Sequence, residues 1–201
     1  MELFNKVTAG RLALPEKVRV NLLALGDVGS TLLLGLRLMG GDVISSMGIC
    51  DVRENAALRW EFELNQIQPP SGAALPPVEI ISPEQLFDGD VFLFCASRMV
   101  PDTSVTGGDV RMAQYGLNRE LAASYARMAR DRGYQGLFCV VSDPVDPLCR
   151  AVGTIICPRR FVNRQNGRTN NGFILKHNCS THTGCCYLCL CRDDKQETQY
   201  S

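Results

Sequence analysis

Gly26 directly follows a largely aliphatic run, 18–25, and Gly29 stands three residues after Gly26. That run has the composition of a buried strand, and residues 31–39 have that of a buried helix. Small residues in a strand-to-helix turn let backbone amides approach an anion, and they let the helix pack closely on the strand. The glycine pair therefore predicts a phosphate-binding turn, in which Ala24 takes the place of the usual first glycine.

An acidic residue, Asp51, follows the next predicted strand, 43–50. An acid at this point can accept hydrogen bonds from adenosine ribose hydroxyls, and its charge disfavours a 2′-phosphate. Together with the turn, Asp51 indicates a dinucleotide site that prefers NAD to NADP. The competing interpretation is an ordinary turn with an unrelated aspartate. Asp27 lies where the pyrophosphate would sit, and its carboxylate could cap the helix instead.

The elements that must position these residues alternate between strand and helix. Further strands are expected at 78–81, 90–95 and 136–141, and further helices at 54–67 and 110–130. The 54–67 helix is expected to bury one face, formed by Leu58, Phe62 and Leu64 or Ile67. Strands that are apolar on both faces imply a parallel sheet covered on both sides. The expected fold class is α/β, a Rossmann-type doubly wound parallel sheet with an irregular C-terminal tail.

Composition divides the 201 residues into two regions. Residues 1–150 carry 14 basic and 18 acidic residues, whereas residues 151–201 carry 7 and 3. Seven of the ten cysteines lie in the last 53 residues. We therefore expect an NAD-binding Rossmann domain over 1–150 and an irregular cysteine-rich tail over 151–201. For the tail, disorder, an interaction segment and the product of a reading-frame change all stay open.

The net charge of zero argues against a nucleic-acid binder and against a polybasic membrane anchor. No apolar run approaches the roughly 18 residues of a membrane span. The first residues also lack the pattern of a secretory signal. We therefore expect a cytoplasmic protein with neither a nucleic-acid nor a membrane partner, whose cysteines are reduced thiols.

The tail contains side chains of the types that zinc prefers: His177, Cys179, His182, Cys185, Cys186, Cys189 and Cys191. Cys186 and Cys189 have a knuckle-like spacing, but the second pair of ligands is irregular. We expect no metal site, and a zinc-binding tail stays as an alternative.

Several motifs in the first 150 residues, taken together, resemble the nucleotide-binding half of the NAD-dependent lactate/malate dehydrogenase family. Their order and spacing carry the resemblance, and they lie at 23–31, 48–53, 94–97, 109–118 and 140–146. The resemblance implies NAD as cofactor and hydride transfer between NAD and a 2-hydroxy or 2-oxo acid. It also implies assembly with further copies of the chain, since family members commonly form dimers or tetramers.

The same resemblance implies roles for individual residues. The implied cofactor contacts are Ala24, Gly26, Asp27, Val28, Gly29, Asp51, Ala96, Ser97, Asn118 and Ser142. On the substrate side, Arg111 takes the position of an arginine that polarises the substrate carbonyl. Asp143 stands where the family has an asparagine, and its charge should weaken binding of a carboxylate substrate.

The family's proton-exchanging histidine has no counterpart in this sequence. That residue lies in a Gly-Glu-His-Gly-Asp type segment, whereas His177 and His182 have unrelated neighbours. Hydride transfer to a 2-oxo acid needs a proton donor near the carbonyl. Two functions therefore stay open: a dehydrogenase reduced to its cofactor domain, or a non-catalytic NAD-binding module with a cysteine-rich interaction or zinc-binding tail.

Overall fold

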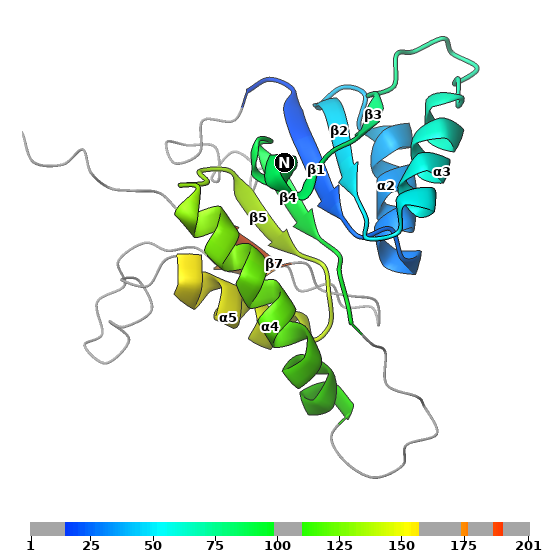
Figure 1. Ribbon diagram of the computed structural model, residues 1–201. Helices are drawn as coiled ribbons and strands as arrows, with labels where there is room; N and C mark the ends of the chain where they lie inside the picture. Colours follow the sequence, from blue (N-terminus) through cyan, green and yellow to red (C-terminus); the bar gives the residue numbers. More distant parts are fainter. Residues whose placement is uncertain (1–14, 99–109, 157–173, 177–186, 191–201) are drawn as a thin grey trace, which may run out of the picture.

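The computed structural model describes residues 15–98 and 110–156, together with two short strands at 174–176 and 187–190. The strands form one sheet in the order β3-β2-β1-β4-β5-β7-β6 (Figure 1). The first five are parallel: β1 (Val18–Leu23), β2 (Ile44–Cys50), β3 (Val78–Ile80), β4 (Val91–Phe94) and β5 (Leu137–Val140). Two antiparallel strands, β7 (Tyr187–Leu190) and β6 (Ile174–Lys176), continue the sheet beyond β5.

Helices cover both faces of this sheet, because its strands are apolar on both sides. One face packs against α2 (Asp27–Met39) and α3 (Glu54–Asn65). The other packs against the 3-10 helix η1 (Pro83–Phe87), α4 (Val110–Asp131) and α5 (Val145–Ile156). The two layers are visible on either side of the strands in Figure 1. The expected Rossmann-type doubly wound α/β fold is therefore confirmed for the parallel part of the sheet.

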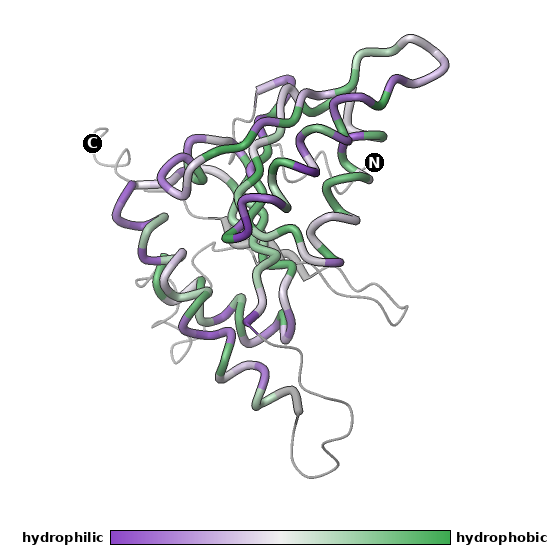
Figure 2. Tube along the Cα trace, turned by 45° about the vertical axis from the view of Figure 1, so that its right-hand side comes forward, coloured by the Kyte–Doolittle hydropathy of each residue, from purple (hydrophilic) through white to green (hydrophobic). Residues whose placement is uncertain are grey.

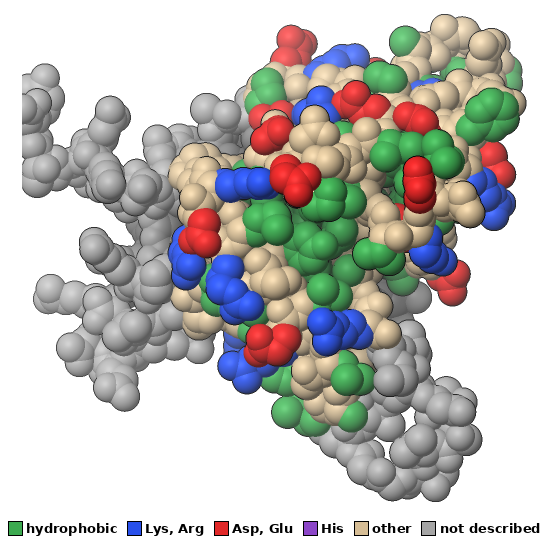
Figure 3. Space-filling model, in the orientation of Figure 1, with side chains coloured by type: hydrophobic (Ala, Val, Ile, Leu, Met, Phe, Trp, Pro, Cys, Tyr) green, Lys and Arg blue, Asp and Glu red, His purple; other side chains and the backbone are tan. Residues whose placement is uncertain are grey.

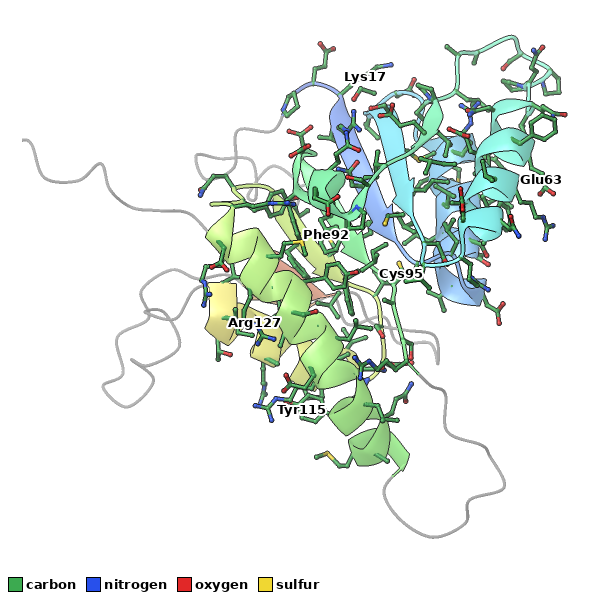
Figure 4. The ribbon with its side chains drawn as sticks, in the orientation of Figure 1. Lys17, Glu63, Phe92, Cys95, Tyr115 and Arg127 are labelled. Atoms are coloured by element: carbon green, nitrogen blue, oxygen red, sulfur yellow. The ribbon has the colours of Figure 1, made fainter. Side chains whose placement is uncertain are left out.

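The face under α4 has an aromatic core. Phe92 and Phe138 lie side by side on β4 and β5, with ring centroids 4.8 Å apart and nearly perpendicular rings. Phe87 of η1 contacts Phe92 at the same centroid distance, and Tyr125 of α4 lies 6.3 Å from it. Figure 4 shows Phe92 between the sheet and α4. Such ring pairs add to the free energy of burial and hold α4 over the sheet.

The helices are amphipathic, and one of them differs from the sequence expectation. Figure 2 shows hydrophilic and hydrophobic residues alternating along the outer helices. In α3, Ala57 and Leu64 are buried, whereas Leu58 and Phe62 are 48% and 70% exposed. The expectation that Leu58 and Phe62 face the core is therefore wrong. The buried face instead follows the helical spacing of Ala57, Trp60 and Leu64.

Helix α5 was not expected from the sequence. Val145, Leu148, Cys149 and Val152 are buried at helical spacing, but Pro144 and Pro147 obscure the pattern. The helix ends at Ile156, beyond the expected boundary at residue 150. Two strands also form within the tail that was expected to be irregular, and β7 pairs with β5.

None of the helices in the described part of the chain is long and apolar enough to cross a bilayer. On the face shown in Figure 3, acidic and basic side chains are interspersed.

Candidate functional site

The predicted cofactor residues gather where four parallel strands end. The strand register pairs Leu23 of β1 with Cys50 of β2 and with Phe94 of β4, and Phe94 with Val140 of β5. The residues that follow each strand therefore lie at one edge of the sheet. The chain reverses its winding between β1 and β4, where doubly wound sheets form their ligand crevice.

In the turn after β1, Ala24 adopts the backbone conformation that a glycine would favour at this position. Ala24 has φ = 75°, in the left-handed region, and its N–H donates to the Cys50 carbonyl at 2.8 Å. A side chain in this conformation is strained by about 1–2 kcal/mol. A Cβ added at Gly29 would lie 2.0 Å from the Ala24 carbonyl oxygen and 3.3 Å from Cys95 Cβ. Gly29 thus allows α2 to pack against the turn, and Figure 4 shows Cys95 at the end of β4.

Gly26 faces open space at the start of α2. It is the N-cap residue, and a Cβ added there would meet nothing within 4 Å. No side chain caps the amides of the first turn of α2, so these amides stay available to an anion. Val28 in the same turn is 56% exposed. The turn therefore provides both the donors and the room that a pyrophosphate needs.

Asp27 does not cap α2, contrary to expectation. It is the first residue of the helix, one position after the N-cap, and its carboxylate is exposed. Its backbone carbonyl accepts a hydrogen bond from Thr31 Oγ1 at 2.7 Å. The exposed acid in the first turn interacts favourably with the helix dipole, but its charge stands close to where a pyrophosphate would bind.

Asp51 lies directly after β2, and its side chain is only 3% exposed. Its Oδ2 accepts from the Leu25 amide at 2.6 Å, and its Oδ1 accepts from the Arg53 amide at 2.8 Å. The Arg53 guanidinium also binds it, with Nε 3.1 Å from Oδ1. Burial alone would raise the pKa of Asp51, but the hydrogen bonds from Arg53 and Leu25 and the guanidinium charge together lower it. Asp51 is therefore ionised at neutral pH and holds the β1 turn against the end of β2.

Asn118 of α4 is fully buried and connects three segments of the site. Its Nδ2 donates to Ser97 Oγ at 3.1 Å and to the Asp143 carbonyl at 2.8 Å. Its Oδ1 accepts from the Arg98 amide at 2.9 Å. The side chain has thus no donor or acceptor directed at solvent, and it fixes the ends of β4 and β5 relative to α4.

Ser142 completes the edge at the end of β5. It is 4% exposed, and its Oγ has no hydrogen-bond partner in the described structure. A buried hydroxyl without a partner is destabilising, and a bound ligand group can supply the missing bond. Ala96 is buried at the equivalent point of β4, and Ser97 next to it is exposed.

Two residues, Asp143 and Arg111, are predicted to face a substrate. Asp143 is exposed at the same edge, following Ser142. Arg111 lies in the first turn of α4, but its side chain is outside the described residues, as are those of His177, His182 and the tail cysteines. Within the described residues, no group of three or more His, Cys, Asp or Glu could hold a metal ion.

Arg53 is the site residue that the sequence analysis did not identify. It is 62% exposed beside a nearly fully buried acid, and its Nη2 also donates to the Leu25 carbonyl at 3.2 Å. The spacing of Asp51 and Arg53 in the sequence could have indicated this contact, because an aspartate side chain often accepts a hydrogen bond from the backbone amide two residues later. That local turn brings the side chain of Arg53 back over Asp51.

Solved structures of dehydrogenases share this fold. A minor L-lactate dehydrogenase from Enterococcus mundtii matches with a TM-score of 0.59 and 19% identity over 71% of this chain and 43% of that one. A malate dehydrogenase from Plasmodium falciparum matches with a TM-score of 0.57 and 16% identity over 69% and 42%. The chain therefore spans less than half the length of these proteins. No protein-family profile and no curated protein sequence matches it. The resemblance to lactate and malate dehydrogenases is confirmed as a likeness of fold.

Proposed function

We propose that this chain binds NAD(H) along the carboxyl edge of its sheet. The observation that carries the proposal is the turn after β1. Gly29 lets α2 pack against the Ala24 carbonyl, where a side chain would clash. Gly26 leaves open space in front of the first-turn amides of α2, which no side chain caps. This combination of a tight packing glycine and an open glycine is what a pyrophosphate requires. The unpartnered Ser142 hydroxyl at the same edge supports it.

Two glycine variants test the proposal. Gly26→Ala puts a methyl group into the open space, where it touches no protein atom within 4 Å, so the variant should fold like the original chain. We expect its affinity for NADH, measured by calorimetry, to fall by about tenfold or more, which is about 1.4 kcal/mol. Gly35→Ala, inside α2 and also facing open space, is the matched control and should leave NADH affinity unchanged. Equal affinities in both variants would rule out a pyrophosphate at Gly26.

We further propose that bound NAD(H) serves hydride transfer with a 2-hydroxy or 2-oxo acid. The support is the shared fold with lactate and malate dehydrogenases. When bound, the nicotinamide would supply the hydride, and solvent would have to supply the proton that the carbonyl oxygen takes up, since the described residues include no histidine. Arg111 and Asp143 are the proposed substrate-side residues, and Asn118 holds Asp143 through a hydrogen bond to the Asp143 carbonyl. Consumption of NADH with pyruvate or oxaloacetate, followed by the loss of NADH absorbance, would support the reaction. NADH binding without consumption would favour the alternative, a non-catalytic NAD-binding module.

A further inference from the structure

The carboxylate expected to bind the ribose is already saturated. A carboxylate offers about four acceptor positions on its two oxygens. In Asp51, Oδ2 accepts hydrogen bonds from the Leu25 amide at 2.6 Å and from Arg53 Nη2 at 3.3 Å. Oδ1 accepts hydrogen bonds from the Arg53 amide at 2.8 Å and from Arg53 Nε at 3.1 Å. A ribose diol can reach Asp51 only after one of these donors leaves.

The guanidinium is the donor that can leave. The two amides are fixed by the turn and by the start of α3, whereas the Arg53 side chain is 62% exposed. An ion pair with an exposed partner contributes little to stability, because solvent screens its attraction. Ribose binding would therefore displace Arg53 from Asp51 while keeping the guanidinium nearby.

The surface over the end of β2 presents the positive charge of the pair. Asp51 lies beneath, 3% exposed, and Arg53 covers it. The hydrogen bonds of the Arg53 guanidinium to the described residues come from Nε and Nη2, and none comes from Nη1. A planar guanidinium with free donors is well suited to bind phosphate oxygens, and an arginine near the ribose can accommodate a 2′-phosphate.

We infer that Arg53 makes this site tolerant of a 2′-phosphate, so that the chain binds NADP(H) as well as NAD(H). The inference rests on the proposed dinucleotide site. It revises the sequence-based expectation that Asp51 selects NAD, because that expectation treated the acid as unpaired. The preference for NAD(H) is not reversed, because the Asp51 carboxylate lies beside the guanidinium and offsets part of its positive charge.

Calorimetry of the full chain with NADH and NADPH, each titrated separately, tests this inference. We expect the two dissociation constants to lie within about tenfold of each other. In Arg53→Gln, NADPH affinity should fall at least about fivefold more than NADH affinity, since the acid is then unpaired and repels the phosphate. The loss of NADPH affinity in Arg53→Lys should be smaller than in Arg53→Gln, because lysine keeps the positive charge but not the bidentate geometry.

Arg59→Gln is the matched control. Arg59 is 66% exposed and pairs with Glu63 on α3, so its loss changes the net charge equally without touching Asp51. Arg59→Gln should leave the ratio of the NADPH to the NADH dissociation constant unchanged. A ratio above about tenfold in the original chain, or an equal effect of Arg53→Gln on both cofactors, would overturn the inference and leave the NAD(H) proposal standing. Binding of neither cofactor would overturn both.

Discussion

At the scale of single residues, close packing at Gly29 decides whether the turn can form. In Gly29→Ala the new methyl group would meet the Ala24 carbonyl at 2.0 Å. Backbone must move to relieve this contact, and we expect a loss of about 3 kcal/mol of unfolding free energy. Gly35→Ala in the same helix meets nothing within 4 Å and should gain about 0.5–1 kcal/mol. Urea denaturation of both variants checks this; equal effects would contradict the packing argument.

Ala24 gives a prediction of the opposite sign. Its φ of 75° suits glycine better than alanine. We expect Ala24→Gly to stabilise the chain by about 1 kcal/mol, since the relief of strain outweighs the greater entropy of an unfolded glycine. Thermal melting measures the change. A lower melting temperature in Ala24→Gly would show that the alanine is not strained there.

Asp51 makes part of the stability dependent on pH. Its pKa in the folded chain is lowered below the unfolded value of about 3.9. The unfolded chain then binds more protons in acid, so the contribution is complete above the unfolded pKa and is lost as pH falls through the folded pKa. We expect the stability gap between the original chain and Asp51→Asn to persist at neutral pH and to narrow below about pH 4. Unfolding free energies measured across this range check it, and a constant gap would refute it.

At the scale of elements, Asn118 connects α4 to the ends of β4 and β5. Removing its side chain leaves the Arg98 amide and the Asp143 carbonyl without their bonds. We expect Asn118→Ala to lose about 2–3 kcal/mol, because buried polar groups become unpaired. Hydrogen exchange at the Arg98 amide should accelerate by more than the global loss of stability explains.

Ser124→Ala is the control for that variant. Its hydroxyl bonds the Leu121 carbonyl on the exposed side of α4, and its removal should change stability by less than about 0.5 kcal/mol. Unchanged exchange at Arg98 in Asn118→Ala would mean that the three segments hold together without Asn118.

The sequence predicted the elements better than the orientation of their side chains. All five parallel strands and helices α2, α3 and α4 were expected near their observed positions, because aliphatic runs and glycine turns are local signals. Which face of α3 is buried depends on the docking of the whole helix, so Leu58 and Phe62 were misplaced. Most of the predicted cofactor residues lie at one edge of the sheet because each directly follows a parallel strand, and the strands end side by side. The saturation of Asp51 by Arg53 and the burial of Asn118 depend on side-chain contacts that no local pattern encodes.

At the scale of the whole molecule, a ligand that binds only the folded chain must stabilise it. NADH at a hundredfold excess over its dissociation constant should raise the unfolding free energy by about 2.7 kcal/mol. Gly26→Ala at the same NADH concentration should show a smaller rise, because its affinity is weaker. Thermal melting with and without NADH gives the comparison, and equal stabilisation of both chains would place the ligand elsewhere.

The central claim is that a dinucleotide lies along the carboxyl edge of the parallel sheet. Amide chemical shifts of the ¹⁵N-labelled chain, recorded during NADH titration, test it most directly. We predict the largest changes at Gly26, Asp27 and Val28, with further changes at Ser97 and Ser142 at the ends of β4 and β5. An absence of changes, or changes concentrated at the opposite edge of the sheet, would contradict the account.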